Sequence, residues 1–174
     1  VGGGQINAWE ISRRLAKKGI DIEIITRNNG KDSLPQVRNI KVHKLGSYTK
    51  PNNLISQIKF MLDLTLFSFK CDFDLIHVHP FLPAIPAKIL SVLKNKPIVF
   101  TVHGTRLFEK KGFLSFGIIL EKFILTSVTY SAVITVTKAF LKIKNINKNI
   151  VYIPNGVNEI FNRNFKKTKS NKQR

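Results

Sequence analysis

Cysteine is almost absent from this chain of 174 residues, in which Cys71 is the only one. A single thiol excludes an intramolecular disulfide framework and any metal site built from several cysteines. This cysteine content agrees with a reducing, cytoplasmic setting. The chain also has no serine in a nucleophile elbow, and Cys71 between Lys70 and Asp72 is not enough for thiol catalysis. The sequence therefore indicates no nucleophile triad.

Acidic residues are scarce as well. Ten Asp and Glu stand against 29 Lys and Arg, which gives a net charge of +19. Such an excess favours an anionic partner, namely nucleic acid, an anionic membrane face or a phosphorylated substrate. The alternative is a lysine- and asparagine-rich composition that only solvates an ordinary surface. No helix-turn-helix, RRM, KH or zinc module is recognisable, so we expect no nucleic-acid partner.

No uncharged apolar run is long enough to cross a membrane. The longest extends from Phe123 to Val136, and it is too short and carries serine and threonine. We therefore expect any membrane contact at the bilayer surface. The predicted location is cytoplasmic, and if the chain meets a membrane, we expect that contact to be peripheral and at the inner face.

Strand and helix patterns alternate along most of the chain. Short runs rich in β-branched residues predict strands at 20–26, 40–45, 73–78, 98–102, 132–136 and 150–153. Apolar periodicity predicts helices from the first glycines to Gly19, at 54–70, from Pro83 or Pro86 to 93, at 113–129 and at 138–144. Alternation of this kind predicts an α/β fold with a doubly wound, mostly parallel, Rossmann-like sheet.

The start of the pattern is unusual for such a fold. A doubly wound domain normally begins with a strand, and a glycine-rich turn follows it. Here Gly2, Gly3, Gly4 and Gln5 come first and lead directly into a helix. Glycines allow backbone amides to approach a phosphate, and a helix N-terminus favours negative charge. The alternative for these residues is a flexible chain end, because neither the dinucleotide nor the P-loop fingerprint is present.

A buried strand at 98–102 ends at His103, Gly104 and Thr105. In open α/β sheets, ligands bind beyond the carboxyl ends of the strands. His103 is therefore a candidate site residue, and Gly104 lets a ligand or another backbone come close. The alternative is a strand-end histidine that binds no ligand.

A second histidine pair, His77 and His79, ends the strand predicted at 73–78. We expect the two side chains to point to opposite faces of the sheet, so that they do not hold a metal together. His77 is interpreted as structural, whereas His79 lies beyond the strand and can line the crevice. The turn at Pro154, Asn155 and Gly156 is interpreted as a simple strand-stopping turn.

Taken together, these motifs resemble the N-terminal domain of a family 4 (group 1) retaining glycosyltransferase of the GT-B fold. The resemblance rests on five features in order, namely the glycine-rich turn, the helix ending in LAKKG, the segment FDLIHVH, the segment KPIVFTVHG and the segment VYIPNGV. It covers the chain from Gly2 to about Phe161. The domain is accordingly predicted at residues 1–161, followed by a basic tail at 162–174 that we expect to be disordered.

The resemblance implies an acceptor-side domain that faces a separate donor-binding domain across a cleft. It implies transfer of a sugar from a nucleotide-sugar donor to a glycan or lipid-linked acceptor, with retention and without a bound metal or other cofactor. The glycine-rich loop at Gly2, Gly3 and Gly4 would approach the donor diphosphate, and His103 would contact the donor sugar as the catalytic residue. Gln5, His79, Gly104 and Thr105 complete the predicted substrate-binding set.

Two departures from the family pattern limit this expectation. The family's first strand is absent, and it would lie mid-sheet between the strands at 20–26 and 73–78, so we expect its loss to leave a groove. The donor domain is absent too, so we expect the isolated chain to be inactive unless a separate donor-domain chain joins it. The alternative function is a non-enzymatic basic module that binds anionic membrane lipid or nucleic acid.

Overall fold

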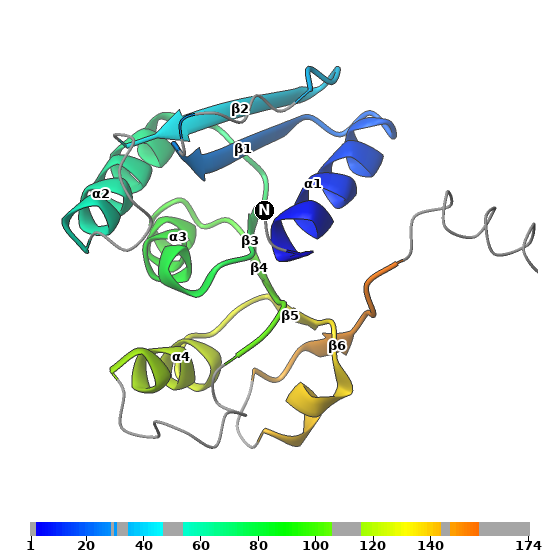
Figure 1. The fold of residues 1–174 in the computed structure, drawn as a ribbon, viewed down its shortest axis with the longest axis vertical. Coiled ribbons are helices and arrows are strands. Elements are labelled where there is room, and N and C mark those ends of the chain that lie inside the picture. The colour runs from blue at the N-terminus through cyan, green and yellow to red at the C-terminus, as the bar shows by residue number, and fades with distance from the viewer. Residues whose placement is uncertain are drawn as a thin grey trace, which may run out of the picture.

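The computed structural model describes residues 3–28, 30, 35–46, 54–105, 116–143 and 147–156. The elements are α1 (Gly3–Ala16), β1 (Ile22–Arg27), β2 (Ile40–Leu45), α2 (Leu54–Lys70), β3 (Ile76–Val78), α3 (Phe81–Leu93), β4 (Ile98–Val102), α4 (Phe116–Thr126), β5 (Ala132–Thr135), a 3-10 helix (Lys138–Lys142) and β6 (Ile150–Tyr152). Strands and helices alternate as predicted, so the α/β class is confirmed (Figure 1). The predicted tail at 162–174 lies outside the described residues.

The strands form two parallel sheets. β1 pairs with β2, and β3, β4, β5 and β6 pair in that order. Among the described residues, no strand pairs with the second edge of β1 or with the second edge of β3. The break between the two sheets therefore falls where the family pattern predicts a further strand, between β1 and β3.

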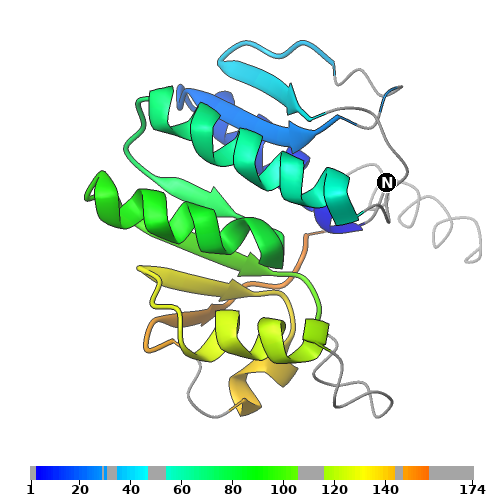
Figure 2. The same cartoon turned by 90° about the vertical axis from the view of Figure 1, so that its left-hand side faces the viewer.

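Helices cover both faces of the strands, as expected for a doubly wound fold. α1 lies on one side, and α2, α3 and α4 lie on the other (Figure 1). A quarter turn of the molecule shows these three helices side by side in one layer in front of the strands (Figure 2). The layer is continuous, because α3 contacts both α2 and α4.

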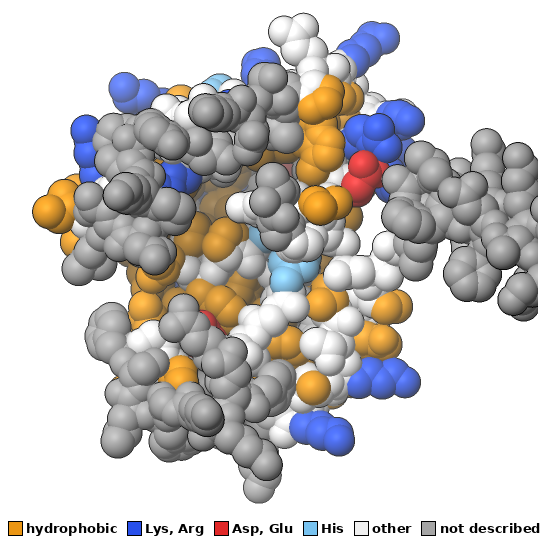
Figure 3. All heavy atoms as spheres, in the orientation of Figure 1, with side chains coloured by type: hydrophobic (Ala, Val, Ile, Leu, Met, Phe, Trp, Pro, Cys, Tyr) orange, Lys and Arg blue, Asp and Glu red, His pale blue; other side chains and the backbone are white. Residues whose placement is uncertain are grey.

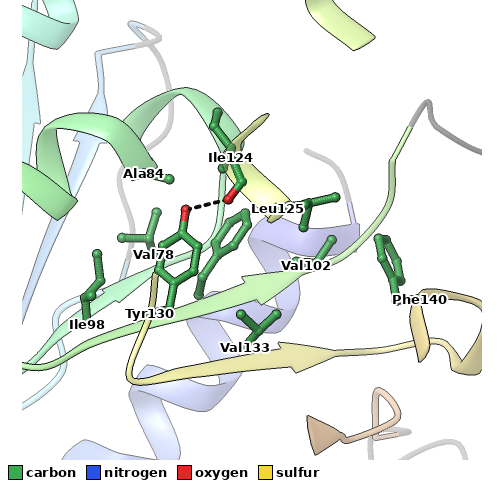
Figure 4. Close-up of a cluster of buried hydrophobic side chains, with 10 residues drawn as sticks. Val78, Ala84, Ile98, Val102, Ile124, Leu125, Tyr130, Val133 and Phe140 are labelled. Atoms are coloured by element: carbon green, nitrogen blue, oxygen red, sulfur yellow. Dashed lines mark hydrogen bonds between the residues drawn. The ribbon is translucent and has the colours of Figure 1, made fainter. Parts of the chain in front are cut away.

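The hydrophobic core lies between the four-stranded sheet and the helices α3 and α4 (Figure 4). Alternate residues of β4, Ile98, Phe100 and Val102, point into it and are at most 1% exposed. Tyr130 is buried beside them and donates its hydroxyl hydrogen to the carbonyl oxygen of Ile124 at 3.2 Å. Because strand side chains alternate between faces, the core fixes Thr101 and His103 on the opposite side, toward α1.

Several elements begin or end a few residues away from their predicted bounds, and the differences at α3 and β3 have an identifiable structural reason. α3 begins at Phe81, ahead of both candidate prolines. Pro83 is tolerated because the first amides of a helix need no intrahelical acceptor, while Pro86 lies inside the helix. β3 is shorter than the predicted 73–78, since pairing with β4 begins only at Ile76.

The periodicity of α2 is confirmed, but its apolar side is not buried. Ile58, Leu62, Leu66 and Phe69 lie on one face, and all four are exposed.

Within the described part of the chain, no helix is both long enough and apolar enough to cross a membrane.

Candidate functional site

Two histidines meet at the carboxyl edge of the four-stranded sheet. β3 and β4 are parallel, with Val78 opposite Phe100, so both strands end at the same edge. His79 Nδ1 lies 3.0 Å from His103 Nε2, and the two rings stack with centroids 5.3 Å apart. Histidine side chains are visible at the centre of the molecular face in Figure 3. The register of two buried strands therefore places His79 and His103 together.

His77 belongs to the same cluster. Its ring centroid lies 4.3 Å from that of His79, and its Nε2 lies 2.7 Å from the hydroxyl oxygen of Thr101. The expectation that His77 and His79 point to opposite faces is therefore wrong. Residues two apart in a strand share a face, because side chains alternate with a period of two. The hydrogen bond to buried Thr101 agrees with the structural role predicted for His77.

All three rings favour the neutral form at neutral pH. Burial lowers the pKa of His79 to about 3, and the neighbouring rings of His77 and His103 act on it in the same direction. Burial, followed by the charge of His103, lowers the pKa of His77, and burial lowers the pKa of His103. A neutral imidazole has one N–H donor and one acceptor nitrogen, so the bond between His79 and His103 holds a single hydrogen.

The beginning of α1 packs directly on His103. A Cβ atom added to Gly4 would lie 3.1 Å from both Cδ2 and Cγ of the His103 ring. A Cβ added to the neighbouring Gly3 would meet nothing within 4 Å. Gly4 is thus the position at which the absence of a side chain permits helix and ring to touch. His103 Nδ1 is buried and has no hydrogen-bond partner among the described residues.

A further contact joins α1 to the turn after β6, and sequence reasoning missed it. The side-chain amide of Asn7 donates to the Asn155 side-chain oxygen at 2.9 Å. Asn155 was interpreted only as part of a turn, and no local pattern links two residues that lie 148 positions apart. Its place after a strand's carboxyl end was the available signal.

The remaining predicted site residues lie differently. Thr105 donates its hydroxyl hydrogen to Glu121 of α4 at 2.8 Å. Gly104 is exposed, and an added Cβ there would meet nothing within 4 Å. Gln5 is exposed in the first turn of α1. Gly2 lies outside the described residues.

The described residues were also compared with two other kinds of site, a metal site and a surface pocket. Among the described residues, no group of three or more His, Cys, Asp or Glu is placed to hold a metal ion. An open pocket of about 520 Å³ is lined by Pro35, Gln36, Val37, Arg38, Ile40 and Val42 beside β2. The histidine cluster is the better candidate site, because it lies at the carboxyl ends of parallel strands and this pocket does not.

Comparison with known proteins gives a consistent result. The Glycosyltransferase Family 4 model matches residues 1–160. A D-inositol 3-phosphate glycosyltransferase of Acidothermus cellulolyticus is 29% identical over 114 residues, which are 59% of this chain and 25% of that protein.

Solved structures agree on the fold. Sucrose-phosphate synthase from Thermosynechococcus elongatus superposes with a TM-score of 0.71 at 20% identity, covering 91% of this chain and 44% of that one. A second structure of the same synthase has a TM-score of 0.63 at 22% identity and covers 94% and 92% of the two chains. This chain thus spans a quarter of the curated relative and under half of the first structure.

Proposed function

The chain belongs to glycosyltransferase family 4, and on that premise we propose that it forms the acceptor-side half of a retaining glycosyltransferase that uses a nucleotide-sugar donor. In the proposed reaction, the bond between the anomeric carbon and the diphosphate oxygen breaks. A hydroxyl oxygen of a glycan or lipid-linked acceptor bonds to the same carbon, and the proton of that hydroxyl passes to the departing diphosphate. The nucleoside diphosphate leaves with the bonding electrons.

The contact between Gly4 and His103 carries this proposal. It joins a helix N-terminus, which favours anionic groups, to a histidine at the carboxyl edge of the sheet. The first turn of α1 carries no acidic residue that would oppose a diphosphate. Gly2, Gly3, Gly4 and Gln5 would therefore face the diphosphate of the donor.

His103 would contact the donor sugar near the reacting carbon. A neutral imidazole can donate to or accept from a sugar hydroxyl, and the lowered pKa of His103 keeps it neutral. His79 would line the same crevice and orient the His103 ring through their hydrogen bond. Gly104 leaves space beside the ring, whereas the hydroxyl hydrogen of Thr105 is already used in the bond to Glu121.

Transfer requires donor and acceptor to be held together, and the donor-binding half would come from outside these residues. We therefore expect the chain alone to transfer no sugar. We also expect activity without a bound metal when a donor-domain chain is supplied.

The test is a sugar-transfer assay with labelled nucleotide sugars. The purified chain is assayed alone and together with the polypeptides encoded on either side of its reading frame. Activity only in a mixture, with the anomeric configuration of the product retained by NMR, supports the proposal. Transfer by the chain alone would contradict the proposed division of labour, and inversion would contradict the proposed stereochemistry.

A further inference from the structure

The turn after β6 contains an Asn-Gly pair, Asn155 and Gly156, in which the backbone can attack the side chain. Both residues are exposed. A Cβ atom added to Gly156 would meet nothing within 4 Å, so the space beside its backbone is open. Among the described residues, the backbone nitrogen of Gly156 donates to no acceptor. This nitrogen is therefore available next to the side-chain amide of Asn155.

Asn7 of α1 contacts the same side chain through its oxygen. The segment after β6 lies on the α1 side of the strands (Figure 1), and the side-chain amide of Asn7 donates to Asn155 Oδ1 at 2.9 Å. A donor at a carbonyl oxygen stabilises the negative charge that grows there when a nucleophile adds to the carbon. The hydrogen bond from Asn7 therefore favours attack on Cγ of Asn155.

A second Asn-Gly pair, Asn29 and Gly30, provides a comparison within the same chain. It differs at the glycine, because the backbone nitrogen of Gly30 donates to the side-chain oxygen of Asn28 at 3.1 Å. That hydrogen bond must break before the nitrogen can attack. Since the two pairs have the same residues, a difference in their reactivity reports the surroundings that the fold provides.

We propose that Asn155 is a site of spontaneous deamidation and that Asn7 promotes the reaction. The nitrogen of Gly156 bonds to Cγ of Asn155, and the bond from Cγ to the side-chain nitrogen breaks. That nitrogen leaves as ammonia, together with the proton of the Gly156 amide. Water then opens the cyclic imide at either of its carbonyl carbons, which leaves aspartate or isoaspartate at position 155.

Deamidation would place a negative charge against α1. Asn7 lies near the beginning of this helix, where the donor diphosphate is proposed to bind. A carboxylate at position 155 would repel the diphosphate, since like charges oppose each other. This consequence rests on the proposed function, whereas the modification itself does not.

The test is incubation of the full chain at mildly alkaline pH, followed by proteolysis and mass spectrometry. Deamidated peptides are recognised by the replacement of a side-chain NH2 group by OH. We expect Asn155 to react about 2- to 10-fold faster than Asn29, because the Gly30 amide must first lose its hydrogen bond. In concentrated urea the two rates should become similar, since both pairs lose their surroundings. A rate at Asn155 that does not exceed the rate at Asn29 in the folded chain would overturn the proposal.

The variant Asn7→Leu tests the promoting role, because leucine has a similar size and lacks the amide donor. The rate at Asn155 should fall about 2- to 10-fold, while the rate at Asn29 stays at the parent value. A rate at Asn155 that is unchanged or higher, with Asn29 at its parent rate, would contradict promotion by Asn7. Unfolding of the variant is recognised separately, because it would raise the rate at Asn29. None of these measurements involves a sugar, so their failure is distinct from a failure of the proposed transferase function.

Discussion

Replacing Gly4 by alanine tests the packing of α1 on His103. The added Cβ would lie 3.1 Å from two ring carbons, whereas carbon atoms normally pack at about 3.5–4.0 Å. The ring must therefore move by several tenths of an ångström, which weakens its 3.0 Å hydrogen bond to His79. Overpacking of this kind costs about 1–3 kcal/mol.

Gly3→Ala is the matched control, because the same methyl group there meets nothing within 4 Å. Both substitutions favour the helix by up to about 1 kcal/mol. In urea unfolding followed by circular dichroism, we expect Gly4→Ala to be less stable than Gly3→Ala by about 1–3 kcal/mol. Equal unfolding free energies for the two variants would refute the proposed contact.

Three other contacts or groups give predictions of their own. The pKa of His79 is lowered to about 3 in the folded state, against about 6.5 unfolded, so the unfolded chain binds more protons between these values. The unfolding free energy should therefore fall as pH drops below about 6.5, by up to about 1.4 kcal/mol per pH unit. In urea titrations at several pH values, His79→Gln should reduce this dependence on pH. An unchanged dependence in the variant would contradict the lowered pKa of His79. A double-mutant cycle on Asn7 and Asn155 should give a coupling of about 0.5 kcal/mol in thermal unfolding, and zero coupling would show that α1 is not tied to the β6 turn. The corresponding cycle with Thr105→Val and Glu121→Ala should give about 1 kcal/mol, and additive effects would argue against the bond.

The position of His103 could be predicted from sequence because its signals are local. A continuous apolar strand followed by histidine and glycine predicts a buried β4 with a polar end, and the structure has both. The bounds of α2 and β2 were predicted equally well, since each is a clear periodic run between turn residues. The two-residue period of a strand also predicts that His77 and His79 share a face of the sheet, although we expected opposite faces.

The contacts that assemble the site have no local signal. Gly4 meets the ring of His103, and Asn7 meets Asn155, only after the chain has folded. Helical periodicity likewise identifies the stripe on α2 containing Leu62 but does not determine whether another element covers it. Long-range packing decides these features, and a single sequence carries no direct record of it.

The proposed contact between His103 and the donor sugar is tested most directly by measuring kcat for sugar transfer. The measurement uses the mixture of polypeptides that shows activity in the transfer assay. His103→Ala is compared with His43→Gln, a control in β2 whose ring packs on Phe67 away from the cluster. We expect His103→Ala to lower kcat by about 100-fold or more, as expected when a polar contact at the reacting centre is lost, while the control keeps the parent rate. A His103→Ala variant that keeps the parent kcat would contradict the proposed role.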